Sequence, residues 1–509
     1  MTEALVALLP IATVLVLMLV ARWSAVRAGA VGLVVALVLV VFVFPFESLG
    51  NDILYGLAGS FAEAIFTALT ILWIILPALA IYRLQVETGA VDSLRSGLSE
   101  LSSDPRLTAL VVAWFFALLL EGAAGFGTSA ALAAPFLMAI GMAPVAAVVA
   151  AMVGHIVGVT FGAVGTPVVP MVTASGLEPV EISSSMALQA STVGWIVPVV
   201  TALIIARAYT DLDPQPRALR WGLGLVAAAA FLIPYVLIAM FVGPELPTLG
   251  GAIVGGAVVV LLIRRISERN HAAVDPDAPE SMSLAKAMAP YLLLVALVLV
   301  TRLVPPLQEA LQSVQISWST DDGVFSGTFE PFYHPGTMLF IAFLAGAAIQ
   351  GARPNQLGGA LQGAGKTLVP VGLALVAMLS LARIMVNSDM VASIASAAAD
   401  AVGGAWPLLA PSVGALGTFV TGSATASNAL FSDLQIATAE AVGVDAALIL
   451  GSQGLGAALG NAIAPHNLIA AAAVVAIAGR ENEILRRTLP VVIPLVIAAG
   501  AVALVLANL

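Results

Sequence analysis

Two short polar stretches lie within otherwise apolar sequence, and both are rich in glycine and in small hydroxyl or amide side chains. The first reads EGAAGFGTS at 121–129, and the second reads TGSATASN at 421–428. Groups of this kind coordinate a carboxylate or a small ion through hydrogen bonds. Helix N-capping by Ser427 and Asn428, or by Thr128 and Ser129, is the structural alternative, and it is compatible with binding. The predicted chemistry is reversible binding of a small polar solute.

Two further segments contain irregular sequence inside long apolar runs. They read FGAVGTPVVP at 161–170 and GNAIAPHN at 460–467. Helix ends that meet at such a break offer N–H groups and positive dipole ends to an anion, while their carbonyl groups face a cation or a hydroxyl. We predict that the two polar stretches and the two breaks form one site for a small, charged, hydroxylated solute. The candidate substrate-binding residues are Gly122, Gly125, Gly127, Thr128, Ser129, Thr166, Gly422, Ser423, Ser427, Asn428, Asn461 and His466.

Glu121 is the one carboxylate within the two polar stretches. A charge at membrane depth costs roughly 2.5–3.5 kcal/mol on insertion scales, so such residues usually serve function. We predict that Glu121 carries a coupling proton, supported by neutral His155 or His466, with Asp433 as the next candidate. The structural alternatives are a Glu121 that caps nearby N–H groups and a His155 that only packs.

Arg383 stands near the expected outer end of an apolar segment. Its guanidinium is suited to attracting an anion, because it offers several donors and keeps its charge. Pairing with the nearby Asp389 is the alternative interpretation, and the sequence favours it slightly.

The composition identifies the solvent of this chain. Of its 509 residues 61% are hydrophobic and 9% are charged, and the mean hydropathy is +1.07. A soluble domain of this size exposes far more charge, so we expect an all-α polytopic protein of the plasma membrane, in contact with lipid. The apolar start, with Glu3 and no basic residue, indicates a first membrane helix rather than a signal peptide. The absence of cysteine excludes disulfides and thiol chemistry.

About twelve membrane helices are expected, because a crossing needs ~20 apolar residues. Ten apolar segments lie at 4–21, 28–46, 61–82, 184–206, 219–242, 247–263, 287–304, 335–351, 367–385 and 488–508. Two more, at 144–178 and 446–479, contain the breaks. With the N-terminus outside, 17 of the 19 basic residues fall on the cytoplasmic side, and the exceptions are Arg302 and Arg383. The positive-inside rule therefore predicts that both termini are extracellular.

The second half of the chain repeats the first at a displacement of about 300 residues. Arg83 matches Arg383, Gly122 matches Gly422, and Pro167 falls near Pro465. The cytoplasmic stretch 84–105 then corresponds to the extracellular stretch 386–405, so the halves are predicted to be inverted. Broken segments in an inverted repeat are typical of secondary transporters, with the binding site between the halves.

Each repeat is expected to contain a re-entrant hairpin followed by a broken helix. We divide the chain into two N-terminal helices (1–60), repeat 1 (61–207), connecting helices with an extracellular loop at 305–334 (208–360), and repeat 2 (361–509). The hairpins occupy 107–142 and 406–443, and the broken helices occupy 144–178 and 446–479. Arms that cross the membrane as short helices are the alternative to re-entrant arms.

Other chemistries find little support in the sequence. GAGKT at 363–367 is similar to part of a phosphate-binding loop, but Ala360 stands where that pattern needs glycine, and a membrane helix follows. There is no HExxH motif, no metal-spaced Cys/His set and no nucleophile elbow. We therefore expect no enzymatic activity, no cofactor, no metal and no nucleic-acid partner.

At these residues the chain resembles the L-lactate permease family. The resemblance rests on EGAAGFGTSAALAAPFL (121–137), FGAVGTPV (161–168), TGSATASNALFSDLQ (421–435), APHN (464–467) and AVVAIAGRE (473–481), and runs from about residue 60 to the C-terminus. It implies proton-coupled uptake of L-lactate, often with D-lactate and glycolate. It also implies inverted repeats, an elevator-type motion and commonly a homodimer. Many members resemble TGSDTSSN, whereas this chain has Ala424 at the position of that aspartate.

Three classes of function remain after this comparison. The leading hypothesis is a carrier that imports lactate with protons, and coupling to sodium or transport of another small carboxylate stays open within that class. A channel is the second, although the chain lacks a regular pore-lining pattern. An intramembrane enzyme is the third and lacks the necessary motifs.

The inverted topology predicts opposite accessibility for two equivalent serines. Ser96→Cys and Ser396→Cys are each made in a chain without background cysteine. In intact cells an impermeant maleimide should react with the extracellular Ser396→Cys and not with the cytoplasmic Ser96→Cys. Labelling of both positions from the same side would contradict an inverted arrangement.

Overall fold

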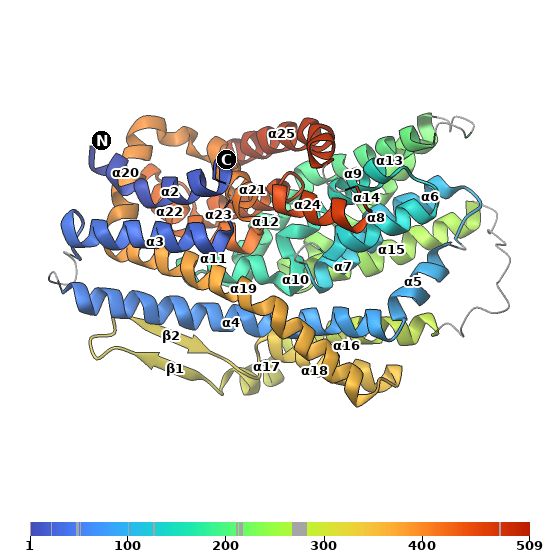
Figure 1. The fold of residues 1–509 in the computed structure, drawn as a ribbon, viewed down its shortest axis with the longest axis horizontal. Coiled ribbons are helices and arrows are strands. Elements are labelled where there is room, and N and C mark those ends of the chain that lie inside the picture. Colours follow the sequence, from blue (N-terminus) through green and yellow to red (C-terminus); the bar gives the residue numbers. More distant parts are fainter. Residues whose placement is uncertain are drawn as a thin grey trace.

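The fold is known from a computed structural model that describes residues 2–21, 23–46, 50, 52–99, 101–125, 128–209, 212, 217–266, 282–477 and 480–509. Helices make up nearly all of it, and one small β-hairpin is the exception within these ranges (Figure 1). The predicted all-α polytopic architecture is thus observed in its main features.

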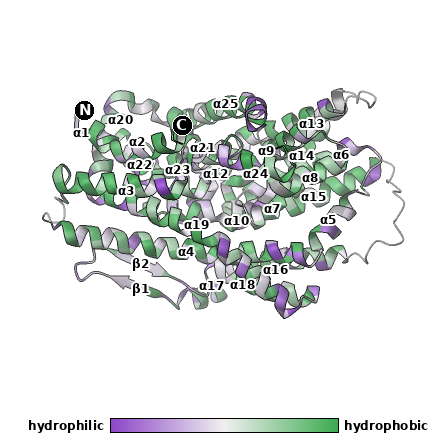
Figure 2. Ribbon diagram, in the orientation of Figure 1, coloured by the Kyte–Doolittle hydropathy of each residue, from purple (hydrophilic) through white to green (hydrophobic). Residues whose placement is uncertain are grey.

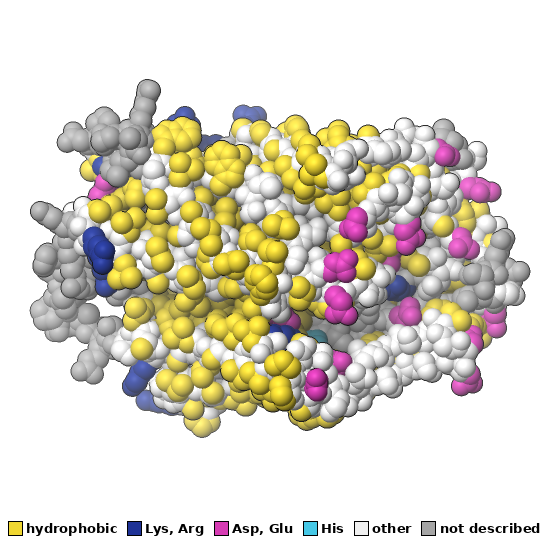
Figure 3. Space-filling view, turned by 180° about the vertical axis from the view of Figure 1, so that it is seen from behind, with side chains coloured by type: hydrophobic (Ala, Val, Ile, Leu, Met, Phe, Trp, Pro, Cys, Tyr) yellow, Lys and Arg dark blue, Asp and Glu magenta, His cyan; other side chains and the backbone are white. Residues whose placement is uncertain are grey.

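Eleven helices are long and apolar enough to cross a membrane, counted over the described residues. Three shorter apolar stretches, Thr2–Met18, Pro144–Gly154 and Pro335–Gln350, fall below that length. Figure 2 shows hydrophobic residues along nearly all of the helices. On the face shown in Figure 3, most Asp and Glu side chains gather toward one end of the molecule and most Lys and Arg side chains lie away from it. The chain is therefore a multi-pass membrane protein.

Two long helices form the central pair of the structure. They are α4 (Ile53–Glu87) and α19 (Pro354–Asn387), of 35 and 34 residues. They run antiparallel and side by side: Gln356 bonds the carbonyl of Glu87 near one end, and Asn387 bonds Ser60 near the other (Figure 1). Midway, a Cβ at Gly372 would lie 3.0 Å from Leu72. The two residues that meet at the centre are thus separated by the same interval as the sequence repeat.

The N-terminal helices pack on the second half of the chain, and the helices that follow α4 contain the first polar stretch. The N-terminal helices are α1 (Thr2–Ala7), α2 (Leu9–Leu19) and α3 (Ala25–Phe42). After α4 come α5 (Ala90–Ser99), α6 (Pro105–Val111), the π-turn η2 (Val112–Phe116), α7 (Ala117–Ala123) and α8 (Thr128–Ala139). Asp104 begins α6 by accepting a hydrogen bond from the N–H of Arg106. The helical stretch Pro105–Ala123 begins two residues before the predicted hairpin (107–142), and its 19 residues meet the length of a crossing helix.

The first predicted break interrupts the next segment. Helix α9 (Pro144–Gly154) ends before the predicted 161–170, and η3 (Ile156–Phe161), α10 (Gly162–Gly165) and η4 (Thr166–Val168) lead to α11 (Val169–Ser175). In the structure the first break therefore runs from His155 to Val168. Helices α12 (Pro179–Gly194) and α13 (Ile196–Ala208) follow. The connecting helices are α14 (Arg217–Phe241), α15 (Pro247–Ile266), α16 (Leu284–Leu303), α17 (Pro305–Gln312) and α18 (Pro335–Gln350). Strands β1 (Ile316–Ser319) and β2 (Ser326–Phe329) pair antiparallel, with Ile316 opposite Phe329.

The second half follows a similar order of elements. After α19 come α20 (Met390–Val402), η5 (Gly403–Ala405), α21 (Trp406–Thr421), α22 (Ala424–Val442), α23 (Ala446–Asn461), α24 (Pro465–Val474) and α25 (Glu481–Leu506). Gly422 ends α21 in a left-handed conformation, and Ser423 then caps α22 by accepting from the N–H of Ala426. The second break, predicted at 460–467, is shorter in the structure and consists of only the residues between Asn461 and Pro465.

The same close backbone contact occurs in both halves. A Cβ at Gly154 of α9 would lie 1.9 Å from the carbonyl oxygen of Ala113, and a Cβ at Gly456 of α23 would lie 1.9 Å from that of Pro411. Glycine is the one residue that permits helices to approach this closely. Each helix that leads into a break is therefore held directly against the first arm of its own half.

Alanine at either position should destabilise the protein. We expect Gly154→Ala and Gly456→Ala each to cost about 1–3 kcal/mol, because the added methyl group meets backbone that has little room to move. Gly358→Ala in α19 is the matched control, since nothing lies within 4 Å of its Cβ. Thermal unfolding of the detergent-solubilised protein, followed by tryptophan fluorescence, measures the difference, and equal midpoints for all three variants would contradict the close contact.

Candidate functional site

The first break is the most irregular backbone in the described chain. Ala163, Val164 and Gly165 have φ values of 44°, 55° and 77°, all in the left-handed region. Such a conformation costs of order 1–3 kcal/mol for a residue other than glycine, and it persists where the surrounding structure imposes it. The whole segment from His155 to Val168 is buried, so its polar groups must find partners within the protein.

The first polar stretch packs against this break. Glu121, only 3% exposed, accepts a hydrogen bond from the hydroxyl of Ser129 at 2.8 Å. Its other carboxylate oxygen lies 2.6 Å from the position that a Cβ of Gly162 would occupy. A Cβ at Gly125 would similarly lie 3.0 Å from that of Ala163. Glu121 thus joins α7 and α8 to the break.

The second polar stretch reaches the same break from the other half of the chain. The buried amide nitrogen of Asn428 donates to the carbonyl oxygen of Pro167 at 2.8 Å. Ala424 packs in one apolar cluster with Val159 of the break. Two stretches that lie about 300 residues apart in the repeat therefore meet at one segment of irregular backbone.

A chain of buried amides extends from Asn428 into the second half. Gln453 of α23 lies 3.3 Å from the Ser427 hydroxyl and 3.4 Å from the side-chain oxygen of Asn428. Its own oxygen accepts from Gln435 at 2.8 Å, and Gln435 accepts from the indole of Trp406 at 2.9 Å. The sequence analysis did not identify Gln435, Gln453 or Trp406. The available signal was a glutamine within an apolar helix, since polar groups in membrane helices usually bond across helices.

His155 connects the first break to the second. Its Nδ1 lies 2.7 Å from the carbonyl oxygen of Ala151, and its Nε2 lies 3.3 Å from Oδ1 of Asn461. A carbonyl oxygen only accepts, so the contact with Ala151 is a hydrogen bond in the tautomer that carries a proton on Nδ1. The backbone oxygen of Asn461 in turn accepts from the amide of Asn467. His155 and Asn461 are therefore brought together as part of one site.

Several of the predicted site residues make contacts that the sequence did not specify. Ser427 donates to the carbonyl of Gly414 in the opposite arm, so the N-cap of α22 is Ser423 and not Ser427 or Asn428. Thr166 donates to the carbonyl of Ala163 and closes the left-handed turn. Gly122 allows close packing on Leu249 of α15. Gly422 packs over His466, which is itself exposed.

Arg383 and Asp433 meet each other rather than the polar stretches. Nη1 of Arg383 lies 3.7 Å from Asp433, and Nη2 donates to the carbonyl of Thr173 at 3.3 Å. The alternative interpretation, a pair between Arg383 and Asp389, is therefore wrong, because the carboxylate that pairs with Arg383 is that of Asp433. The candidate for anion attraction and the second candidate for proton coupling thus form one ion pair between α19 and α22.

Two of the predicted site positions are not described by the structure. One residue that was not predicted, Thr418, lies close to the second polar stretch. Gly127 and the side chain of Thr128 lie outside the described residues. The hydroxyl of Thr418, one turn before Gly422, is fully buried without a hydrogen-bond partner. The described residues contain no group of three or more His, Cys, Asp or Glu side chains able to hold a metal ion.

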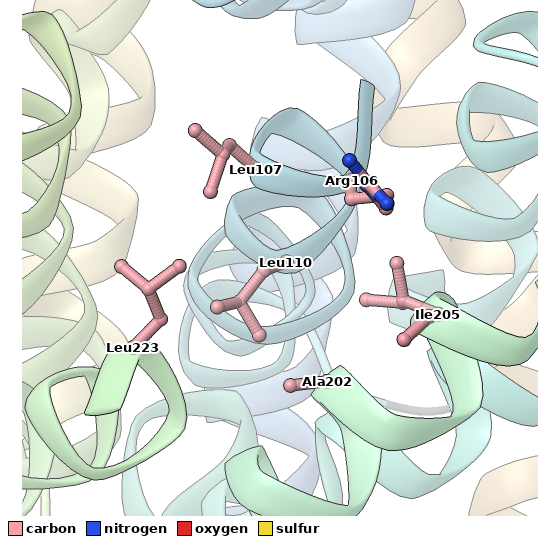
Figure 4. Close-up of a pocket in the computed structure, with 7 residues that line it drawn as sticks. Arg106, Leu107, Leu110, Ala202, Ile205 and Leu223 are labelled. Atoms are coloured by element: carbon pink, nitrogen blue, oxygen red, sulfur yellow. The ribbon is translucent and has the colours of Figure 1, made fainter. Parts of the chain in front are cut away.

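A small pocket elsewhere is unrelated to this site. It lies between α6, α13 and α14 and is lined by Arg106, Leu107, Leu110, Ala202, Ile205, Ala206 and Leu223 (Figure 4). None of these residues belongs to a polar stretch or a break. Arg106 is also engaged by Asp104 at 2.9 Å. The pocket therefore offers a mostly apolar lining with one paired charge.

Apolar helices around buried, irregular polar segments define a multi-pass membrane protein with an internal polar site. The chain belongs to the L-lactate permease family, whose sequence profile matches residues 3–509.

Curated relatives cover most of the chain. It is 28% identical to the L-lactate permease of Streptococcus iniae, over 86% of this chain and 91% of that protein. It is also 28% identical to glycolate permease GlcA of Escherichia coli K12 and to the L-lactate permease of Bacillus subtilis 168. Each of those matches spans 96% of this chain and 92% of the relative.

Two solved structures are similar at lower identity. MtrF of Neisseria gonorrhoeae, described as one of a class of antimetabolite efflux pumps, superposes with a TM-score of 0.48 at 16% identity, over 90% of this chain and 84% of MtrF. The YdaH transporter of Alcanivorax borkumensis gives a TM-score of 0.48 at 18% identity, over 88% of this chain and 86% of YdaH.

The bond from Asn428 to Pro167 should stabilise the first break. Asn428→Asp keeps the size of the side chain but removes its donor and places a carboxylate against the carbonyl, a buried mismatch of about 1–3 kcal/mol. We expect faster hydrogen–deuterium exchange in peptides covering 155–170. Asn387→Asp, which removes the donor to Ser60, is the control and should leave these peptides unchanged. Unchanged exchange in Asn428→Asp would show that the bond does not hold the break.

Proposed function

We propose that this protein is a secondary active transporter of the plasma membrane that imports L-lactate by proton symport, with D-lactate or glycolate as further substrates. The observation that carries this proposal is the match of the L-lactate permease family to residues 3–509. The names of the relatives, L-lactate permease and glycolate permease, point to a small 2-hydroxy acid. Coupling to sodium, or another small carboxylate, is the alternative within this class, and an anion channel is less well supported.

The chemistry of the site suits such a substrate. A hydroxy acid carries one carboxylate and one hydroxyl, so it needs several donors and one acceptor close together. The breaks leave backbone N–H and carbonyl groups free of helical partners, and Ser, Thr and Asn side chains surround them. The buried Thr418 hydroxyl adds a group without a partner. We assign substrate binding to the twelve residues predicted from the sequence, centred on Thr166 and Asn428.

Inverted repeats explain three features of the fold. The central antiparallel helices meet at Leu72 and Gly372, as expected for a two-fold axis in the membrane plane. The Gly154–Ala113 contact has its counterpart in Gly456–Pro411. Each polar stretch also packs on the break of its own half. We propose repeats at 61–207 and 361–509, re-entrant hairpins at 107–142 and 406–443, both termini outside, and an elevator motion in a possible homodimer.

Glu121 is the proposed proton carrier. It is buried, it contacts both the Ser129 arm and the break, and any movement of the hairpin changes its surroundings. Burial favours the neutral form of a carboxyl group, and an opposite charge nearby favours the ionised form. His155, bonded to Ala151 and Asn461, is the supporting residue. Asp433, held by Arg383, is the second candidate.

Transport assays in proteoliposomes test the function. Purified protein should accumulate radiolabelled lactate when an inward proton gradient is imposed, and not when a sodium gradient replaces it. Unlabelled lactate inside the vesicles should drive uptake of labelled lactate without any ion gradient, because a carrier exchanges its solute and a channel does not. Failure of both measurements would exclude lactate as the substrate.

Replacement of Glu121 should separate coupling from exchange. Glu121→Gln is expected to abolish lactate accumulation driven by pH, while lactate exchange at equal pH stays within about threefold of the parent, since binding groups remain. Uptake and counterflow in the same vesicle preparation measure both quantities.

Glu440→Gln is the matched control, because that carboxylate lies exposed at the end of α22. It should retain both activities.

If Glu121→Gln still concentrates lactate against its gradient, the proton travels elsewhere. Asp433→Asn is then the next variant, followed by a test of a sodium ion bound by carbonyl groups at the breaks.

A further inference from the structure

A buried ion pair lies outside the site described so far. Nη2 of Arg302 donates to Oε1 of Glu245 at 2.7 Å, and the two side chains are only 7% and 10% exposed. The guanidinium carbon of Arg302 also lies 3.5 Å from the centre of the Tyr333 ring, a cation–π contact. Arg302 is one of the two basic residues that depart from the charge asymmetry of the sequence.

The pair joins two different groups of helices. Arg302 stands at the end of α16, which packs on α18, and α18 packs on the central helix α4. Glu245 lies in the short turn between α14 and α15, and α15 packs on α7 and η3 beside the first break. The ion pair therefore connects the helices around α4 to the part of the molecule that carries the candidate site.

The turn that contains Glu245 touches the break directly. A Cβ at Gly165 would lie 2.6 Å from the carbonyl oxygen of Pro244 and 3.2 Å from the backbone nitrogen of Glu245. Gly165 is left-handed and precedes Thr166, a candidate substrate-binding residue. A shift of this turn would consequently shift the backbone of the break.

The hydrogen bonding of the pair is incomplete. Nη1 of Arg302 and Oε2 of Glu245 are buried and have no partner. A buried pair with unsatisfied atoms contributes little net stability, because desolvation of the charges offsets their attraction. Burial, and then the nearby Arg302, lower the pKa of His334 to about 4, so this imidazole is neutral at physiological pH. Because the Arg302–Glu245 pair adds little net stability, its main effect is to fix the position of the turn and the helix that it joins.

We propose that Arg302 and Glu245 are positioning residues for transport, which hold the α14–α15 turn against Gly165 and so keep the first break in its substrate-binding arrangement. This inference rests on the proposed function of the first break as part of the substrate site. Among the described residues, the hydrogen bond, ion pair and cation–π contact of Arg302 and Glu245 involve only each other and Tyr333, so the effect passes through the turn.

Kinetics of lactate exchange in proteoliposomes test the proposal. Arg302→Gln and Glu245→Gln should each raise the KM for lactate about tenfold, which corresponds to about 1.4 kcal/mol, with little change in maximal rate. Arg302→Lys, which retains the charge, should recover most of the affinity. Arg487→Gln, which breaks the exposed pair with Glu483, is the matched control and should leave KM unchanged.

Two outcomes would overturn the proposal. One is an unchanged KM in variants that unfold at the parent temperature. The other is a lower melting temperature and a lower maximal rate without any change in KM, because the pair would then only stabilise the fold. If the Gln variants are not produced, Arg302→Lys alone must show an intermediate KM, and a KM equal to that of the parent overturns the proposal.

A measurement without substrate separates this inference from the proposed function. Thr166→Cys places one thiol in the break of a chain that has no other cysteine. Adding Arg302→Gln should raise its rate of reaction with maleimide about tenfold, since the break loses its support. Equal rates would overturn the positioning role, even if the transported solute is not lactate.

Discussion

The structure depends on one constraint: irregular backbone that is buried away from water must satisfy its polar groups within the protein. The first break, from His155 to Val168, is the longest buried segment of this kind in the described chain. Asn428 approaches it from the second half, Glu121 from α7, and the α14–α15 turn from the connecting helices. These elements pack around the first break for this reason. Each of them either supplies a hydrogen-bond partner or lies in the space left where a glycine has no side chain.

The two breaks satisfy the same constraint by different means. The second is a short interruption between Asn461 and Pro465, and the side chain of Asn467 bonds the carbonyl of Asn461. The first contains three successive left-handed residues and draws its partners from distant parts of the chain. The two halves therefore share an order of elements but differ in the backbone of their breaks.

Local sequence was sufficient to predict the breaks, the polar stretches and most membrane helices, because Gly, Pro and apolar run length act over a few residues. It did not predict how long the first arm is, since the apolar pattern does not mark where Pro105 begins the helix. It also failed where partners are distant. Arg383 pairs with Asp433, 50 positions away, rather than with Asp389, and Glu245 lies 57 residues from Arg302. The glutamines of the amide chain were missed because an isolated polar residue in an apolar helix does not reveal its partner. His466, which stays a predicted site residue, is exposed and packs beside Gly422.

The left-handed Ala163 and Val164 have a consequence for how this chain can change over evolutionary time. Together they hold roughly 2–6 kcal/mol of conformational strain, a sizeable part of the 5–15 kcal/mol by which a typical protein is stable. Glycine at either position would relieve that strain, and it is reached from either codon family by a single base change. Selection for heat tolerance alone would favour the exchange. Alanine and valine at these positions therefore give this chain a stiff, disfavoured turn where glycine would give a more stable fold.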